Sequence, residues 1–463
     1  MPVIPEGIAY AYTHETTQAT TGYFSCQPPA SLTLPQALAR LEATPFDDFL
    51  RQHCLRQLSR RSPEEIKNLA DELYDRETDS FRRMGLAGLL LECSLLVPEL
   101  AHCCDGFPED ALQRLTLSSS LIYLRAASRK DFGLMQAWSA HFADNIARHH
   151  MLPHWEELEL ELPYSEEELE VCREGLRARA GMLEREHARM QAEDLPRLER
   201  RPAQETYEQA VNALLENDVL AGQEMRHQAS LSPIALLRSW KVDLAVDCGR
   251  MRHSLRGEAT AYGRGLSLAA ARASYAMEIV ERASSYVSVA RTGEHTFEVT
   301  NRRRPMPLVH ASCAKLRSQG KDFLPLSSLP LETPFEDYVP LYWLEARDPE
   351  GKTVLVPAQA VFLFCNLDEQ SLFLAGGSTG LASGNTEAEA RLAALTEIVE
   401  RDAEATTPFS REGCFVLKSR DERLQALLDD YAARGIQIQF QDITTELGVP
   451  VYRCFVMSRR GEV

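Results

Sequence analysis

The chain has 463 residues, of which 44% are hydrophobic and 25% are charged, as in an ordinary soluble globular protein. This length is large for a single core, so we expect two or three domains. The net charge of −18 argues against nucleic-acid backbones and anionic lipids as main partners. Eleven cysteines without a Cys-x-x-Cys pair favour free thiols in a reducing compartment, and the amino terminus has no signal-peptide pattern; we therefore predict a cytoplasmic protein without a membrane span.

Residues 1–231 are predicted to form a mainly helical accessory domain, whose role the sequence does not assign. Ser62, followed by Pro63 and two glutamates, is typical of a helix start. The most apolar run, residues 84–100, contains Glu92 and a proline, which indicates a buried core helix. Residues 156–228 are rich in Glu and Arg and are broken by two prolines, Pro196 and Pro202. They are either a charged helix pair packed on one face or an arm that binds a partner.

Residues 232–463 are predicted to form an α+β domain with an antiparallel sheet and paired duplicated helices. Two strand-like runs flank the turn sequence at residues 347–351, which predicts a hairpin. Ile436, Ile438 and Phe440 alternate with polar residues, as in a half-buried strand, and residues 451–457 form the next strand.

One segment of this second half occurs twice. Residues 271–282 return at residues 390–401, and both copies end in Glu-Ile-Val-Glu-Arg. Ser267 and Thr386 stand at equivalent places before the two copies, where each can cap a helix. A duplicated structural helix with internal ion pairs is the simpler interpretation. Two capped copies in register, each preceded by glycine, favour a duplicated binding site instead.

The spacing places carboxylates and small residues on one face of each helix. In the first copy this stripe is Ala271, Ser274, Glu278 and Glu281, and in the second it is Ala390, Ala393, Glu397 and Glu400. Four carboxylates without nearby His or Cys form a hard oxygen site, which favours Mg²⁺. Arg282 and Arg401 are placed to hold carboxylates or phosphates. The glycines before each cap permit close approach of the backbone to a ligand, and helix amino termini attract anions.

These residues resemble the YcaO family over about residues 240–463. The resemblance lies in the Gly-Arg-Gly loop at 263–265, the Gly-Leu-Ala-Ser-Gly-Asn segment at 380–385, and the two Glu-x-x-Glu-Arg helices that follow them. It implies binding of ATP and Mg²⁺ without a Walker loop. It also implies phosphorylation of a peptide backbone amide oxygen, which leads to azolines, thioamides or amidines.

The resemblance also implies roles for individual residues. The metal would be held by Glu278, Glu281, Glu397 and Glu400. The nucleotide would be contacted by Arg264, Ser274, Arg282, Asn385 and Arg401. No catalytic residue is assigned.

The sequence departs from the family pattern at two places. Arg264 stands where the family normally has Lys. The chain stops at Val463, where family members continue with a further helix and often a proline-rich end, so we expect the domain to be truncated.

Two functions are therefore carried forward. The first is an ATP-dependent enzyme that activates an amide in a peptide or protein, with a partner protein that delivers substrate or sulfur and with a homodimer as one possible assembly. The second is a non-catalytic nucleotide-binding scaffold that supports a partner enzyme such as a ribosomal-protein methylthiotransferase. Histidine and cysteine pairs elsewhere, such as His149 and His150 or Cys103 and Cys104, lack a characteristic metal spacing and are left out of the site.

Overall fold

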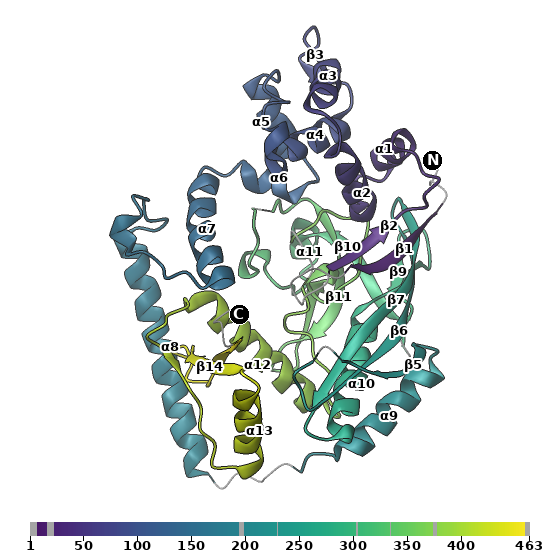
Figure 1. The fold of residues 1–463 in the computed structure, drawn as a ribbon. Coiled ribbons are helices and arrows are strands. Elements are labelled where there is room, and N and C mark those ends of the chain that lie inside the picture. Colours follow the sequence, from purple (N-terminus) through teal and green to yellow (C-terminus); the bar gives the residue numbers. More distant parts are fainter. Residues whose placement is uncertain are drawn as a thin grey trace. The chain divides into compact units, whose positions relative to one another are not determined.

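The computed structural model describes residues 7–15, 23–193, 199–228, 230–301, 304–333, 335–373 and 377–458. Pro196 and the carboxyl-terminal residues 459–463, both used in the sequence analysis, lie outside the described residues. The fold is α+β, as predicted. Contacts divide the chain into two compact units, residues 1–129 with 201–385, and residues 130–200 with 386–463 (Figure 1).

The first unit contains a large mixed sheet with helices packed on it. Its strands are β1 (Ile8–Glu15), β2 (Tyr23–Gln27), β5 (Leu220–Arg226), β6 (Ile234–Cys248), β7 (Met251–Gly265), β8 (Val289–Arg291), β9 (Phe297–Val299), β10 (Met306–Ser312), β11 (Pro340–Arg347) and β12 (Thr353–Pro357). The order is β12-β11-β10-β9-β8-β6-β7-β1-β2, and β5 pairs with β6. Most pairings are antiparallel, as predicted, but β1–β7 and β6–β8 are parallel.

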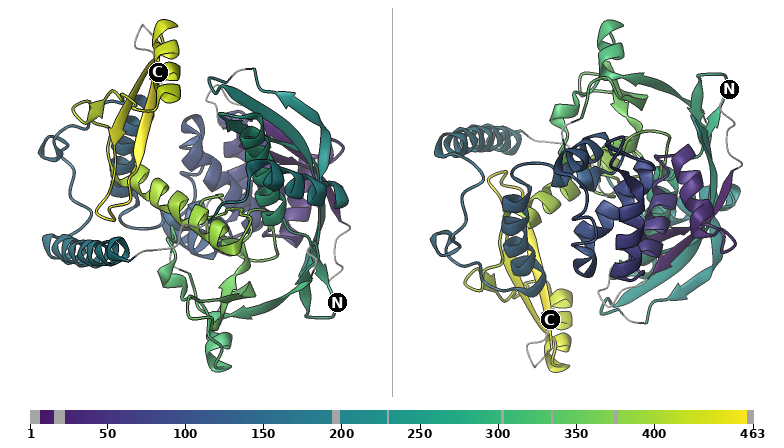
Figure 2. Two further views of the ribbon diagram at one scale, coloured as in Figure 1. Left: turned by 90° about the horizontal axis from the view of Figure 1, so that it is seen from below. Right: turned by 90° about the horizontal axis from the view of Figure 1, so that it is seen from above.

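The helices of this unit form two groups. The amino-terminal group comprises α1 (Leu34–Ala43), α2 (Asp48–Leu58), α3 (Pro63–Leu73), α4 (Met84–Leu96), α5 (Glu109–Ser118) and α6 (Ile122–Ala127), with a short hairpin of β3 (Tyr74–Asp75) and β4 (Ser80–Phe81). The later helices are α9 (Ala203–Glu216), α10 (Leu268–Ser285) and α11 (Cys313–Ser318). Figure 2 shows the amino-terminal helices, in purple and blue, gathered beside strands β1 and β2.

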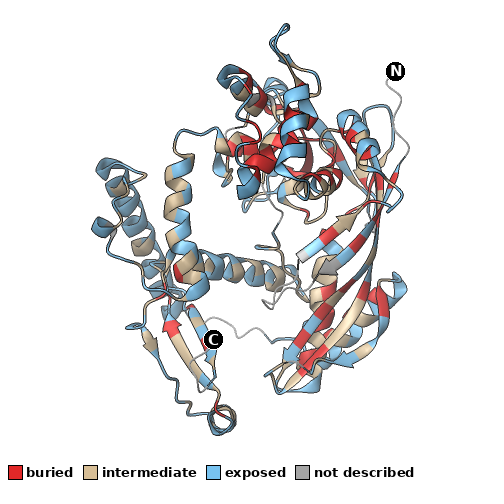
Figure 3. Ribbon diagram, turned by 45° about the horizontal axis from the view of Figure 1, so that its top comes forward, coloured by how far each residue is buried: buried red, intermediate tan, exposed pale blue. Residues whose placement is uncertain are grey.

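Local sequence signals explain several of these elements. Ser62 caps α3 in a capping box with Glu65, as the sequence predicted. The apolar run at residue 84 is the buried helix α4, and its buried Glu92 is bound by Arg51 at 2.9 Å. Figure 3 shows the buried positions of these helices in red. None of the described helices is long and apolar enough to cross a bilayer.

The amino-terminal segment does not stay apart from the later sheet. Strand β1 pairs with β7 from Ile8 to Tyr12, and one continuous core contains residues of α2, α4, β6 and α10. The domain boundary that we predicted between residues 231 and 232 remains a prediction. The compact units of the structure cut across it, because β1 and β2 complete an edge that the later strands leave open.

The second unit combines two sequence regions. It contains α7 (Phe132–Arg148), α8 (Glu166–Ala192), α12 (Glu387–Thr406), β13 (Cys414–Phe415), α13 (Glu422–Ala433), β14 (Gln437–Asp442) and β15 (Tyr452–Met457). Strands β14 and β15 pair antiparallel from Gln437 to Asp442, which confirms the predicted strand pair. Asn145 of α7 joins the two sequence regions of this unit, because its side chain donates to the Phe409 carbonyl and accepts from the Phe409 N–H.

Candidate functional site

Helix α10 carries the first copy of the repeat. Ser267 caps it as predicted, since its Oγ accepts the N–H of Ala270 at 3.2 Å. Tyr275, Ala276 and Ile279 are buried in the core with β6 and β7. The helix therefore presents a different face, with exposed Ser274 and the half-buried Glu278 and Glu281, away from that core.

The glycines of the Gly-Arg-Gly loop allow α10 to lie directly on β7. A Cβ atom at Gly263 would lie 2.0 Å from the Ala271 carbonyl oxygen, and one at Gly265 would lie 2.8 Å from the Ala270 Cβ. These positions need glycine for helix–strand packing, and approach of their backbone to a ligand remains a prediction. Ala271, the first small residue of the stripe, is likewise fully buried against the strand, so this end of the stripe packs on the sheet.

Arg282 organises the two carboxylates of α10. Its Nε lies 2.9 Å from the Glu278 Oε1, and its Nη1 lies 3.6 Å from the Glu281 Oε1. Burial works to lower the pKa of Arg282, but the two carboxylates outweigh it, and the net shift is upward. The guanidinium thus stays charged and holds both acids near the carboxyl end of the helix, as the spacing predicted.

Arg264 lies on strand β7, where residues alternate between buried and exposed. Gly263 is buried toward α10, and Arg264 is exposed on the opposite face of the strand. The structure therefore does not bring Arg264 onto the face that carries the Glu278 and Glu281 carboxylates. Its contact with a nucleotide remains a prediction.

The Gly-Leu-Ala-Ser-Gly-Asn segment is fixed to the same helix. The Ser383 hydroxyl donates to the Met277 carbonyl at 2.8 Å, which anchors the loop beside Glu278. Asn385 at the end of the loop accepts from Arg201 at 3.5 Å. Sequence reasoning missed Arg201 because it lies in a stretch rich in arginine and glutamate, where no single arginine stands out.

Helix α12 carries the second copy and belongs to the second unit. The Thr386 hydroxyl accepts the N–H of Glu389, which confirms the predicted cap. Arg401 pairs with Glu400 at 2.8 Å and with Glu404 at 2.5 Å. Glu404, which the repeat did not single out, thus shares this arginine. Ala403 is the buried residue of α12, and it packs with Ile443 and Val451.

The four predicted metal ligands are divided between the two compact units. Glu278 and Glu281 belong to the first unit, and Glu397 and Glu400 belong to the second. Within the described ranges, no group of three or more His, Cys, Asp or Glu side chains is arranged to hold a metal ion. Convergence of the two carboxylate pairs on one metal remains a prediction.

The histidine and cysteine pairs that were left out of the site contribute to packing. His149 ends α7 in a left-handed conformation and packs between the rings of Phe409 and Phe455. Cys103 and Cys104 are buried, and burial raises the pKa of both thiols, to about 11 for Cys104.

The structure thus shows an α+β protein with two capped helices, each of which carries two glutamates followed by an arginine. Comparison with protein families gives the same result. Residues 262–463 match the family model described as YcaO cyclodehydratase, ATP- and Mg²⁺-binding. This match agrees with the resemblance found in the sequence, and the description of the family model names ATP and Mg²⁺, the cofactors expected from the sequence.

Two curated proteins are similar to a part of this chain. An uncharacterized protein in the tfuA 3′ region of Rhizobium leguminosarum bv. trifolii is 28% identical over 204 residues, which is 42% of this chain and 44% of that protein. An uncharacterized protein of Methanothermobacter thermautotrophicus is 30% identical over 197 residues, which is 40% of this chain and 45% of that protein. The match thus spans less than half the length of these relatives.

Solved structures give weaker similarity. A YcaO protein of Methanopyrus kandleri bound with AMPPCP and Mg²⁺ has a TM-score of 0.33 at 20% identity, covering 52% of this chain and 53% of that chain. A heterocyclase in complex with substrate and cofactor has a TM-score of 0.37 at 18% identity, covering 57% and 37%. At these scores the similarity carries no argument about function.

Proposed function

We propose that this protein binds ATP and Mg²⁺ and activates a backbone amide of a peptide or protein by phosphorylating its oxygen. The observation that carries the proposal is the duplicated, capped Glu-x-x-Glu-Arg helix within the part of the chain that matches the YcaO family. The family match supports ATP-dependent activation of a backbone amide as the general reaction. Formation of an azoline, a thioamide or a related product is the finer part of the proposal.

The donor groups fit the proposed cofactors. Glu278, Glu281, Glu397 and Glu400 offer carboxylate oxygens, which Mg²⁺ prefers over nitrogen or sulfur. Arg282 and Arg401 stand beside these acids and can neutralise phosphate charge. Asn385, on the loop that Ser383 fixes to α10, would hydrogen-bond the nucleotide.

The chemistry needs such a site because an amide oxygen is a poor leaving group. In the proposed reaction the amide oxygen bonds to the γ-phosphorus of ATP, and ADP leaves. A nucleophile then attacks the amide carbon, and the oxygen departs as inorganic phosphate. Bound Mg²⁺ would neutralise charge on the transferring phosphate. The carboxylates of α10 and α12 would hold the metal, and the arginines would orient the phosphates.

Isothermal titration of the full chain with ATP and MgCl₂ tests this proposal. We expect saturable heat that requires magnesium and falls at least about tenfold in affinity in Glu281→Gln and in Glu400→Gln. Glu298→Gln, on β9 and outside the repeat, is the matched control and should bind as the parent does. Absence of magnesium-dependent heat in a folded protein would contradict the proposal.

The second candidate is a scaffold that binds ATP without turning it over. It is favoured by the exposed position of Arg264 on the face of β7 opposite α10. Phosphate release separates the two functions: an enzyme releases phosphate in proportion to added peptide substrate, whereas a scaffold binds ATP with no release above background. A partner for peptide delivery or sulfur transfer belongs to either function.

A further inference from the structure

A pocket of about 490 Å³ lies in the second unit, where the carboxyl end of α7 meets the segment around β13 and the strands β14 and β15. Its lining comes from both sequence regions of this unit, with residues 148–150 on one side and residues from 409 to 457 on the other. Two arginines and two histidines line it, and none of its described lining residues is Asp or Glu. The pocket therefore differs in charge from the chain as a whole, whose net charge is −18.

One wall of this pocket is a set of packed rings. Phe409 and Phe455 are buried, and their ring centroids lie 5.3 Å apart. The His149 ring packs on both, with its centroid 5.1 Å from that of Phe409 and 5.0 Å from that of Phe455. Asn145 fixes the backbone of Phe409 through hydrogen bonds of 3.2 Å and 2.8 Å. The pocket is thus formed by ordered packing.

The basic groups around the pocket outnumber the acids that pair with them. The Asp144 carboxylate lies 3.3 Å from the Arg148 Nη1 and 2.8 Å from the His150 Nδ1, so one acid serves two basic side chains. Arg453 is bound by two backbone carbonyls and one amide oxygen, but by no carboxylate of the described chain. Burial and the charge of Arg453 lower the pKa of His149, which keeps this imidazole neutral at pH 7. The positive charge near the pocket therefore resides mainly on arginines.

Two of the side chains that line the pocket have N–H donors without an acceptor. Arg411 is exposed and makes no ion pair or side-chain hydrogen bond with the described residues. The side-chain amide of Gln439 on β14 makes none with them either. The Cys414 thiol, by contrast, donates to the Ser410 carbonyl at 3.4 Å. The pocket thus combines a guanidinium group and an amide that are open to a ligand with an apolar wall.

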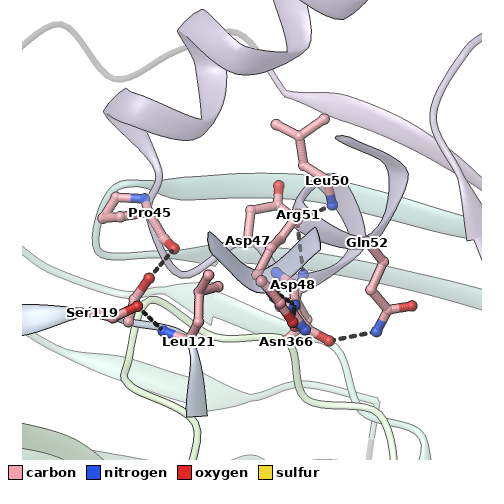
Figure 4. Close-up of polar contacts among 11 residues, drawn as sticks. Pro45, Asp47, Asp48, Leu50, Arg51, Gln52, Ser119, Leu121 and Asn366 are labelled. Atoms are coloured by element: carbon pink, nitrogen blue, oxygen red, sulfur yellow. Dashed lines mark hydrogen bonds and ion pairs between the residues drawn. The ribbon is translucent and has the colours of Figure 1, made fainter. Parts of the chain in front are cut away.

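The charged groups of the first unit near α2 show the opposite arrangement, in which each acid has a partner within the fold. Asp48 pairs with Arg51 at 2.6 Å (Figure 4). The Asn366 side chain donates to the Asp47 carboxylate at 3.1 Å. These acids need no ligand, whereas the charge of Arg411 in the second unit is not matched by any described acid.

We propose that the pocket of the second unit binds the free carboxyl terminus of a peptide whose last residue is apolar, with Arg411 as the counter-ion and the rings of Phe409 and Phe455 against the apolar side chain. This inference rests on the proposed function, which makes the substrate a peptide or protein. A guanidinium group can bind both carboxylate oxygens at once, and the Gln439 amide can donate a further hydrogen bond. The apolar side chain gains free energy from burial against the rings.

The combination of lining groups favours a carboxyl terminus over other anions. In a carboxyl-terminal residue the carboxylate and the side chain are joined to one Cα atom, so a charge and an apolar group enter the same pocket together. An acidic side chain brings its carboxylate on a short stem without a separate apolar group. A phosphate group has no apolar part that the rings could bury. The net charge of −18 repels anions in general, so the attraction must come from the local arginines.

The test uses the full chain without nucleotide and three probes. Nα-acetyl-leucine carries the carboxyl terminus, its primary amide lacks the charge, and Nα-acetyl-glutamic acid α-N-methylamide carries its carboxylate on the side chain. Titration followed by saturation-transfer NMR should give about tenfold tighter binding of Nα-acetyl-leucine than of either other probe. Equal binding of Nα-acetyl-leucine and its amide would overturn the proposal, and so would equal or tighter binding of the glutamic acid probe.

Two matched variants separate the pocket from the general charge of the protein. Arg411→Gln should reduce the preference for the acid over the amide to near one, and it should fold as the parent does because the residue is exposed and unpaired in the described chain. Arg420→Gln removes the same charge from an exposed position of the same unit outside the pocket, and it should keep the preference. A preference retained in Arg411→Gln, or lost equally in Arg420→Gln, contradicts the assignment of the carboxylate to Arg411.

The result is distinguishable from failure of the proposed function. If ATP and Mg²⁺ bind but the preference for the carboxylate is absent, the pocket assignment is wrong and the proposed function stands. If the preference is present but ATP does not bind, the nucleotide proposal is wrong and the pocket is a separate recognition site.

Discussion

Glu369 is a buried residue whose charge state is strongly shaped by its surroundings. Burial raises the pKa of its carboxyl group to about 8, although the Tyr342 N–H and the Gln359 amide act in the opposite direction. The ordinary value is 4.5. Between these two pH values the unfolded chain has lost this proton while the folded protein retains it. The contribution of Glu369 to stability is therefore fully present below pH 4.5 and is lost as the pH rises to about 8.

This shift in pKa predicts that Glu369→Gln stabilises the protein, relative to the parent, more strongly at high pH than at low pH. The variant cannot ionise, so its free energy of unfolding relative to the parent should rise from pH 5 to pH 8.5, by about 1.4 kcal/mol for each pKa unit of the shift that is crossed. Urea unfolding at the two pH values measures the difference. A difference that does not change with pH would show that the carboxyl group titrates normally.

Arg282 holds the two carboxylates of α10 in place. It contacts both acids of α10, whereas Arg401 pairs with Glu400 and Glu404 on α12. We expect Arg282→Lys to weaken ATP–Mg²⁺ binding by about tenfold, because a point charge cannot bridge two carboxylates as a planar fork does. Titration calorimetry measures the loss. Arg272→Lys, which affects the Glu224 pair instead, is the control and should bind normally.

At the scale of elements, the packing of α10 on β7 depends on glycine. Gly263→Ala would place a Cβ atom 2.0 Å from the Ala271 carbonyl oxygen, so the helix must shift away from the strand. We expect a loss of about 1–3 kcal/mol or more in stability by urea unfolding. Gly85→Ala, where no atom lies within 4 Å of the added Cβ, should be neutral or stabilising. Equal stability of the two variants would contradict this packing argument.

Helix α8 has no fully buried residue among its 27 residues. Leu169, Leu176, Leu183 and Met190 recur every seven residues and form one apolar seam along the helix, which a second copy would cover. In parallel pairing with a second copy, Arg179 would lie beside the partner's Glu184. We therefore expect a homodimer through α8.

Sedimentation velocity tests this expectation. The double change Leu176→Glu and Leu183→Glu should give a monomer, because both residues lie in the seam and are about 40% exposed. Val171→Glu changes another exposed apolar residue outside the seam and should leave the dimer intact. A monomeric parent protein at micromolar concentration would contradict the expectation.

At the scale of the whole molecule, the proposed site takes one carboxylate pair from each compact unit. If both pairs bind one metal–nucleotide complex, their effects cannot be independent. We expect the loss of ATP affinity in the double variant Glu281→Gln and Glu397→Gln to be smaller than the sum of the two single losses in free energy. A double-mutant cycle by titration calorimetry measures this coupling. Additive losses would indicate two separate sites.

Much of the fold could be predicted from the sequence because it depends on local patterns. The caps at Ser62, Ser267 and Thr386 act within one helical turn, and each was found where the sequence placed it. Strands β14 and β15 were also found, since alternation with period two is a local signal. The entry of β1 into the later sheet was missed, because pairing between residues 8–12 and 253–257 leaves no pattern in either segment alone.

The sequence by itself determined the duplicated acidic helices and their caps, and it carries the resemblance to the YcaO family that the match over residues 262–463 supports. Tertiary structure alone decided that Gly263 serves helix packing, that Arg264 faces away from α10, and that the Glu369 carboxyl group is buried on the Tyr342 N–H. The physical reason is the distance along the chain over which each interaction acts. Helix caps and periodicity act over a few neighbouring residues, whereas burial and the pairing of charges depend on segments that meet only when the chain folds.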